Sequence, residues 1–95
     1  MSLKLELVNN GKYNVFVIEG DEYIGNAISK GHEWDAWMRK DLEKYYVDRT
    51  EILDIGANIG YNSLMFSDYG PVVSFEPVYH DVVIKNAQNN ALKHS

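Results

Sequence analysis

The region from residue 52 to 92 alternates short apolar runs with helical patterns, and this alternation constrains the fold more than any other feature of the chain. Residues 52–55 and 72–75 are nearly continuous apolar runs, as in strands that lie inside a parallel sheet. Residues 61–68 and 79–92 have the apolar spacing of helices. The order strand, helix, strand, helix predicts a βαβα unit of an α/β protein, with parallel strands and a right-handed crossover.

A stop signal follows the first of these helices. Gly70 can adopt the left-handed backbone conformation that closes a helix, and Pro71 cannot continue one. We therefore expect the helix to end near Asp68 and Gly70 to take the left-handed exit.

Two alternating apolar runs flank the dipeptide Asn10-Gly11 near the N-terminus. This dipeptide suits a two-residue turn with positive φ, so the sequence predicts a β-hairpin in which Leu5 faces Phe16. One side of that ribbon is almost wholly apolar, and we expect another element to cover it.

The stretch from Glu33 to Val47 carries apolar residues at spacings of three and four and charged residues mostly on the other side, which predicts an amphipathic helix. Its apolar positions are Trp34, Trp37, Met38, Leu42, Tyr45 and Tyr46. An aromatic stripe with this spacing favours packing in the core over a stacking platform for a base. Before it, Ile24 and Ile28 fit one short helical turn between glycines.

Composition excludes several classes of function. The chain has 95 residues, which suits one small domain, and nine Lys and Arg against fourteen Asp and Glu give a net charge of -5 without a basic block. Nucleic acid is therefore a poor partner, because phosphate binding needs clustered positive charge. There is no cysteine, no secretory signal pattern and no run long enough to span a membrane. We expect a soluble cytoplasmic protein with no membrane partner.

The candidate site begins where the first predicted strand of the βαβα unit ends. Asp54, Gly56, Asn58 and Gly60 follow one another in the pattern D-x-G-x-N-x-G, which combines a carboxylate with residues that tolerate positive φ. Glu76 ends the second strand. Ligands of βαβ units bind outside the carboxyl ends of the strands, so we expect the loop and Glu76 to share one edge.

The expected ligand contains a ribose, because a carboxylate at the end of the second strand can accept hydrogen bonds from both ribose hydroxyls. Dinucleotides and S-adenosylmethionine both have that ribose. The loop carries Asp54 and no Lys or Arg, and it differs from the dinucleotide pattern G-x-G-x-x-G, in which an anionic pyrophosphate rests on a helix N-terminus. The cationic sulfonium of S-adenosylmethionine suits this loop better.

A structural explanation stands beside each functional one. Asp54 could cap loop amides, Gly56 and Gly60 could allow close packing of helix on strand, and Glu76 could be solvated. The convergence of the whole set on one edge favours a binding site.

The segments DIGANIGYNSL and VVSFEP, followed by NAQNN, resemble the FkbM family of class I S-adenosylmethionine-dependent methyltransferases. Upstream, ISKGHEWDAWMRKDLEKYY is similar to the helix that precedes the first motif in that family, so the resemblance covers roughly residues 25 to 90. It implies that the loop shapes the methionine side of a cofactor pocket and that Glu76 holds the ribose. The residues that the resemblance assigns to the cofactor are Asp54, Gly56, Ala57, Asn58, Gly60, Glu76 and Pro77.

The resemblance also implies a fold, an activity and a departure from the family. Residues 1–50 would be an N-terminal hairpin and helix, and residues 51–95 the first half of a truncated Rossmann-like sheet that has seven strands in class I methyltransferases. Members generally methylate oxygen on sugars or other small molecules. With most of the acceptor site absent, we expect the chain to be inactive alone and to expose an unpaired sheet edge and an uncovered apolar face that invite homo-oligomers. The alternative is a non-catalytic nucleotide-binding or assembly module.

No catalytic base is assigned. Methyl transfer is an in-line displacement that depends mainly on orientation and exclusion of water. His32, His80 and His94 are candidates by residue type, but we expect all three to be surface residues. No pattern of metal ligands is present in the sequence. Glu33 could reach the amino-acid end of the cofactor in such proteins, although a solvated acid at a helix start is the expectation.

Overall fold

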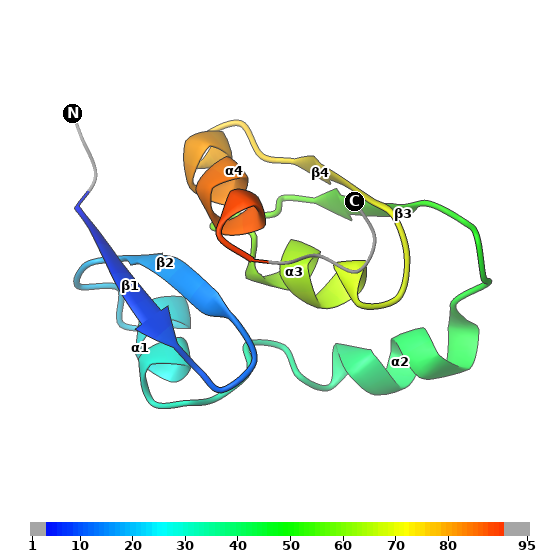
Figure 1. Ribbon diagram of the computed structural model, residues 1–95, viewed down its shortest axis with the longest axis horizontal. Helices are drawn as coiled ribbons and strands as arrows, with labels where there is room; N and C mark the ends of the chain where they lie inside the picture. The colour runs from blue at the N-terminus through cyan, green and yellow to red at the C-terminus, as the bar shows by residue number, and fades with distance from the viewer. Residues whose placement is uncertain (1–3, 91–95) are drawn as a thin grey trace.

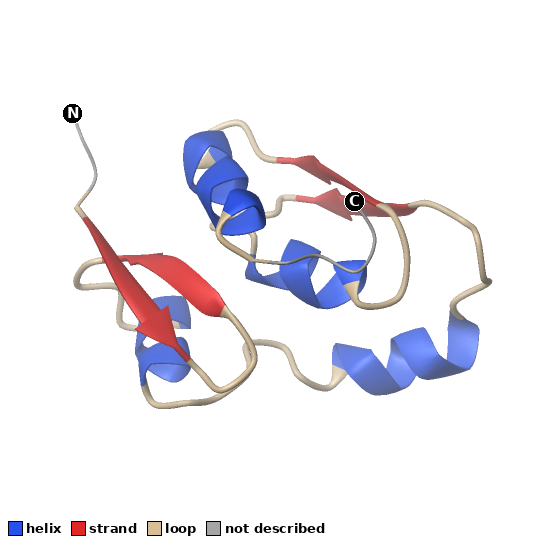
Figure 2. Ribbon diagram, viewed as in Figure 1, coloured by secondary structure: helices blue, strands red, loops and turns tan. Residues whose placement is uncertain are grey.

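A computed structural model of the chain describes residues 4–90 and divides them into two small sheets and four helices (Figures 1 and 2). In chain order the elements are β1 (Leu5–Asn9), β2 (Asn14–Ile18), α1 (Ile24–Ser29), α2 (Met38–Tyr45), β3 (Ile52–Ile55), α3 (Tyr61–Ser67), β4 (Val72–Phe75) and α4 (His80–Gln88). β1 and β2 form an antiparallel hairpin, and β3 and β4 form a parallel pair. The α/β class, the hairpin and the order of the βαβα unit are confirmed.

The hairpin has a different register from the predicted one. Leu5 pairs with Ile18 rather than with Phe16, so the connection is longer than a two-residue turn. The side chain of Asn10 causes this: its Oδ1 accepts hydrogen bonds from the amides of Lys12 and Tyr13, both at 3.1 Å, and builds a wider turn. Because the shift is two residues, every side chain keeps its face.

The deeply buried face of the hairpin is not the one that the sequence predicted. Val15 and Val17 are buried, whereas Leu5 and Phe16 on the opposite face are only half-buried and Leu7 is exposed. The buried face packs against side chains from three helices and the loop after β3, in one core formed by Tyr13, Val15, Val17, Ile28, Ile59, Tyr61, Leu64 and Val82. The core thus joins the N-terminal hairpin to the βαβα unit.

Asn86 of α4 and Asn90, just beyond its end, bind the outer edge of β2 much as a third strand would. The side chain of Asn86 accepts a hydrogen bond from the amide of Phe16 at 2.6 Å and donates to its carbonyl at 3.0 Å. Asn90 does the same for Asn14, at 3.0 and 2.8 Å. Two residues of strand span about 6.6 Å, and the two asparagines, four positions apart in the sequence, bind the alternate strand residues Phe16 and Asn14.

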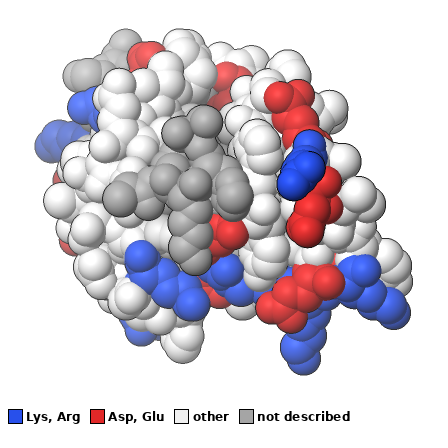
Figure 3. Space-filling view, turned by 45° about the vertical axis from the view of Figure 1, so that its right-hand side comes forward, with Lys and Arg blue, Asp and Glu red and all other residues white. Residues whose placement is uncertain are grey.

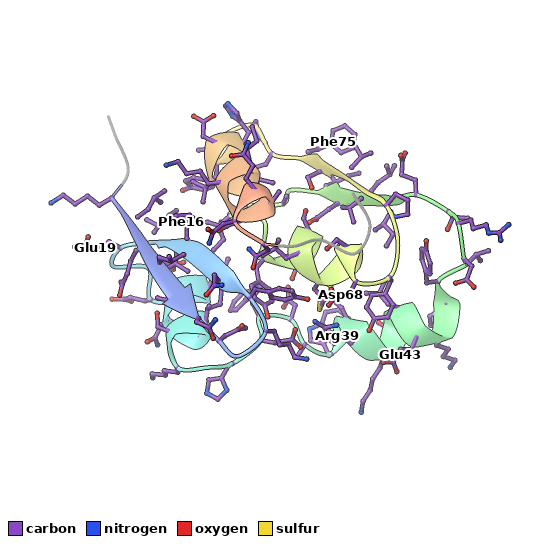
Figure 4. The ribbon with its side chains drawn as sticks, viewed as in Figure 1. Phe16, Glu19, Arg39, Glu43, Asp68 and Phe75 are labelled. Carbon is purple, nitrogen blue, oxygen red and sulfur yellow. The ribbon has the colours of Figure 1, made fainter. Side chains whose placement is uncertain are left out.

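The parallel pair β3–β4 has one covered and one open face. Asp54 and Ser74 face α3, where the hydroxyl of Ser63 lies 2.6 Å from Asp54 and 2.5 Å from Ser74. On the other face Leu53, Ile55, Val73 and Phe75 are exposed, with Ile55 at 79% and Phe75 at 50%; Phe75 points away from α3 in Figure 4. The two strands were predicted to be buried, but on this face they are not, because no element among residues 4–90 covers it. An uncovered apolar face was also expected from the resemblance.

Helix α2 begins at Met38, five residues later than predicted, and has no buried residue. Asp35 interrupts the predicted helix with a left-handed φ of 53°. The prediction that the aromatic stripe is core was wrong for Trp37 and Tyr45, which are 62% and 68% exposed, whereas Trp34 is half-buried and packs against the core. The helix runs along the outside of the molecule (Figure 1), and its stripe borders an open apolar groove that it shares with Phe66.

The other helix predictions hold with small changes. α1 covers the predicted turn, α3 ends one residue early, and α4 ends at Gln88, with Ala91 and Leu92 outside the described residues. Gly70 does not have a positive φ, so the predicted left-handed exit is wrong. Its lack of a side chain is needed for packing instead, because an added Cβ would overlap the ring of Tyr46. Within residues 4–90, every helix is too short or too polar to cross a membrane.

Candidate functional site

The loop between β3 and α3 has the left-handed backbone that its composition predicted. Gly56, Asn58 and Gly60 have φ values of 75°, 57° and 91°. A Cβ on Gly56 would meet no atom within 4 Å, so this glycine serves the backbone conformation alone. A Cβ on Gly60 would lie 3.2 Å from Val83 of α4, so Gly60 serves close packing as well, although against a helix and not between helix and strand as the structural alternative supposed.

Backbone hydrogen bonds attach the start of this loop to the end of β4. The amides of Gly56 and Ala57 both donate to the carbonyl of Phe75, at 2.8 and 3.2 Å. The next residue after Phe75 is Glu76, so the loop and the acid share one edge of the parallel pair, as predicted.

The carboxylate of Glu76 organises the chain around it. It accepts hydrogen bonds from the amides of Asn58 at 2.8 Å, Val78 at 2.9 Å and Tyr79 at 3.2 Å. These bonds, led by the one from Val78, hold the pKa of Glu76 below its usual range. A carboxylate offers about four acceptor positions, so one remains for a further donor. The alternative that Glu76 is simply solvated is therefore wrong, because its carboxylate holds three backbone amides.

Asp54 faces the interior rather than the loop. It is buried, and Ser63 donates a hydrogen bond to it at 2.6 Å. Burial raises the pKa of Asp54. The hydrogen bond from Ser63 lowers it, and the negative charge of Glu76 raises it further, so the net pKa lies above its usual value. Asp54 thus joins β3 to α3 and neither caps the loop amides nor reaches the cavity described next.

A cavity of about 180 Å³ lies beside the loop. Residues 56–59 form one side of it, and residues from α1, from the turn before α2 and from the start of α3 form the rest. Of the predicted site residues, those that line this cavity are Gly56, Ala57 and Asn58; those that do not are Asp54, Gly60, Glu76 and Pro77. Pro77 is exposed.

Two polar residues of the cavity were missed from the sequence. The side-chain amide of Asn62 donates to Oδ2 of Asp35 at 3.1 Å, and Oδ1 of Asn62 is buried without a hydrogen-bond donor among residues 4–90. Asp35 and Asn62 both fall in segments that the sequence predicts as helix. Polar residues at these positions would be expected to face solvent. The one available signal was Asp35 itself, an acid between two tryptophans that tolerates left-handed φ and can interrupt a helix.

Glu33 belongs to a separate polar network. Its carboxylate accepts hydrogen bonds from Nε of Arg39 at 2.9 and 3.0 Å and from the hydroxyl of Tyr61 at 3.1 Å. Arg39 also contacts Asp68 at 3.2 Å, and Tyr13 hydrogen-bonds to both Arg39 and Asp68; Arg39 and Asp68 face each other in Figure 4. Burial raises the pKa of Glu33, but Arg39, Tyr61 and Lys12 together outweigh it, so the net pKa lies below the usual range. Glu33 is neither solvated nor part of the cavity.

The histidines of the described region lie on the surface, as expected. His32 and His80 are exposed, and His80 contacts the carboxylate of its neighbour Asp81 at 3.2 Å. His94 lies outside the described residues. Neither exposed histidine lines the cavity beside the loop.

Charged side chains of both signs are interspersed on the face shown in Figure 3. Lys and Arg lie next to Asp and Glu along its right-hand and lower margins, so this face presents no continuous basic surface.

Comparison with known proteins gives no family for this chain: it matches no protein-family model, and searches of curated proteins and of solved structures give no significant match. The resemblance to FkbM methyltransferases therefore stays a prediction.

Proposed function

We propose that this chain is the cofactor-binding part of an S-adenosylmethionine-dependent methyltransferase of the FkbM type, with the βαβα unit as the first half of a Rossmann-like sheet. The observation that carries the proposal is the hydrogen bond from Asn58 to Glu76, which joins the left-handed loop to the acid at the shared end of two parallel strands. Methyl transfer to an oxygen of a sugar or another small molecule is what the resemblance implies for the acceptor.

The residues at this edge fit such a cofactor. Glu76 keeps one acceptor position for a ribose hydroxyl, and the loop from Gly56 to Gly60 carries no cation that would repel a sulfonium. When bound, S-adenosylmethionine supplies the electrophilic methyl carbon. The chain's own residues hold and orient the adenosine and the amino-acid end and exclude water from them. The proposal assigns no base to the chain.

Calorimetry with S-adenosylmethionine, S-adenosylhomocysteine and NAD tests the proposal, with circular dichroism to establish that the sample is folded. We expect the first two to bind and NAD not to bind, because no Lys or Arg of the loop is available for a pyrophosphate. Binding of NAD alone would support a dinucleotide-binding domain instead. In Glu76→Gln we expect weaker binding of both adenosyl ligands, with Glu43→Gln on the exposed side of α2 as the matched control.

A second candidate is a non-catalytic nucleotide-binding or assembly module. Two observations favour it: Gly60 is explained by its contact with Val83, and three acceptor positions of Glu76 are used by the chain's own amides. The open apolar face of β3–β4 offers a surface for assembly. A folded sample that binds none of the three ligands would support the assembly role and contradict the methyltransferase.

A further inference from the structure

The turn of the β1–β2 hairpin contains a reactive dipeptide that the proposed function does not use. Asn10 is the one asparagine of the chain that precedes a glycine. This order favours deamidation, because glycine has no side chain to hinder attack by its own backbone nitrogen and its backbone adopts many conformations. We propose that Asn10 is a deamidation site that folding controls: it reacts while the hairpin is detached from the core and is protected in the folded chain.

The reaction begins with ring closure. The backbone nitrogen of Gly11 gives its proton to solvent and bonds to Cγ of Asn10, the bond from Cγ to Nδ2 breaks, and the side-chain nitrogen takes a proton from solvent and leaves as ammonia. Water then opens the resulting succinimide at either carbonyl and yields aspartate or isoaspartate. Water is the co-reactant, so the reaction requires only a conformation that frees the Gly11 amide and exposes Asn10.

The folded turn holds both reacting groups. The amide of Gly11 donates a hydrogen bond to Oδ1 of Asn9 at 2.7 Å, so its proton is retained. Asn10 is buried, and its Oδ1 accepts hydrogen bonds from the amides of Lys12 and Tyr13, both at 3.1 Å. These two bonds polarise the carboxamide, but the ring does not close while the nucleophile keeps its proton and the amide plane is fixed.

The leaving group is bound by residues from outside the hairpin. Nδ2 of Asn10 donates to the hydroxyl of Tyr61 at 2.8 Å and to the carbonyl of His32 at 3.1 Å. The reversed amide would place its nitrogen against two amide donors, so this orientation is fixed. Asn10, His32 and Tyr61 form the junction between the turn and the core, and ring closure requires this junction to open.

The product does not fit where the amide was. A carboxylate at residue 10 has no hydrogen to donate, so it would face the carbonyl oxygen of His32 without a hydrogen bond. The hydroxyl of Tyr61 has one hydrogen, which it donates to Glu33 at 3.1 Å, so it can satisfy Glu33 or the new carboxylate but not both. Isoaspartate also adds a backbone carbon to the turn. Deamidation of an unfolded chain therefore opposes refolding.

The first experiment compares the folded chain with the chain unfolded in guanidinium chloride, at one pH and temperature. Peptide mapping by mass spectrometry locates each conversion of amide to acid. We expect Asn10 to react before every other asparagine in the unfolded sample, and about tenfold or more slowly in the folded one, because only the open population reacts. Equal rates in the two samples, or a faster reaction at another asparagine in the unfolded one, would overturn the proposal.

A second experiment tests the junction. Tyr61→Phe removes the hydroxyl that holds Nδ2 of Asn10, and Tyr23→Phe, at a tyrosine that is 74% exposed, is the matched control. In native buffer we expect Asn10 to react about fivefold faster in Tyr61→Phe than in the wild type, the effect of one lost hydrogen bond, and at the wild-type rate in the control. Circular dichroism establishes that both variants are folded. An unchanged rate in Tyr61→Phe would show that the junction does not protect Asn10.

A third variant carries the product from the start and decides the matter if Tyr61→Phe does not fold. We expect Asn10→Asp to unfold at a lower urea concentration than the wild type or to remain unfolded. Asn26→Asp, with the same change of charge at an exposed asparagine of α1, should unfold at the wild-type concentration. An Asn10→Asp protein as stable as its control would contradict the effect on refolding. None of these measurements uses a ligand, so their outcome is independent of the proposed function.

Discussion

Helices α2 and α3 have comparable lengths and were both predicted from the spacing of their apolar residues, yet their surroundings are opposite. Five of the seven residues of α3 are buried, whereas α2 has none. α3 lies between the hairpin and the β3–β4 pair, and α2 runs along the outside (Figure 1). The comparison teaches that apolar spacing predicts a helix and its preferred face but not whether an element is available to cover that face.

Contacts of a different kind hold α2 in place. Arg39 joins it to Glu33 before the helix and to Asp68 at the end of α3, and Tyr46 packs on Gly70 just beyond α3. The attachment of α2 therefore depends on one ion-pair network and one close steric contact, while that of α3 depends on burial of apolar area.

Truncation of matched leucines gives the largest expected difference. Leu64 of α3 is buried and Leu42 of α2 is only half-buried. We expect Leu64→Ala to lower the free energy of unfolding by about 2–5 kcal/mol, because it leaves a cavity in the core, and Leu42→Ala by less than about 1 kcal/mol. Urea unfolding measures both. Equal losses would mean that α2 is packed as firmly as α3, which contradicts the difference in burial between the two helices.

The contact between Gly70 and Tyr46 comes next. In Gly70→Ala the new Cβ would overlap the tyrosine ring and displace it, together with the 2.7 Å hydrogen bond from its hydroxyl to the carbonyl of Thr50. We expect a loss of about 1–3 kcal/mol in thermal or urea unfolding. In a Tyr46→Ala background the same substitution should cost much less. If the loss persists in that background, its cause is the backbone at Gly70 and not the contact with Tyr46.

The network around Glu33 predicts a dependence on pH. The folded-state pKa of Glu33 is lowered, so its contribution is fully present above the unfolded value of about 4.3 and is lost as the pH falls through the folded value. We expect Glu33→Gln to cost about 1–2 kcal/mol at pH 7 and progressively less below pH 4, measured by urea unfolding. Asp54 has a raised pKa, so its effect on stability changes with pH in the direction opposite to that of Glu33. The wild type and Glu33→Gln both contain Asp54, so its effect cancels when the two are compared. A difference that is constant with pH would exclude the ion pair as the cause.

The smallest effect is expected at Trp37. Because this side chain is 62% exposed, Trp37→Ser should change the free energy of unfolding by no more than about 0.5 kcal/mol. A buried tryptophan would cost about 3–5 kcal/mol when truncated. A loss in that range would restore the predicted core role of the aromatic stripe, and the measurement is again urea unfolding at a protein concentration low enough to exclude self-association.

The sequence contained enough information for the elements but not for the long-range contacts that adjust them. Strands β3 and β4 and helix α3 lie within a residue of their predicted positions because local apolar patterns determine them. The hairpin register differs because Oδ1 of Asn10 accepts hydrogen bonds from the amides of Lys12 and Tyr13. The side-chain nitrogen of Asn10 also donates to Tyr61, 51 positions away, a partner that no local turn rule includes.

The candidate site was predictable to a similar extent. That the loop and Glu76 share an edge follows from the rule for parallel strands, and positive φ at Gly56, Asn58 and Gly60 follows from residue type. The cavity was not predictable, because Asp35 and Asn62 come from segments that read as ordinary helix and meet only in three dimensions. The NAQNN segment was read only as part of a family resemblance, yet Asn86, Asn89 and Asn90 all bind β2.

Those asparagines also determine when the hairpin is complete during synthesis. β2 emerges from the ribosome about 70 residues before Asn86, at a time when the amide and carbonyl of Phe16 have no partner in α4. Until α4 is made, this edge can pair with a strand of another nascent chain. Once Asn86 and Asn90 are in place, polar side chains that cannot extend a sheet occupy this edge, so a segment about 70 residues downstream protects the hairpin against aggregation.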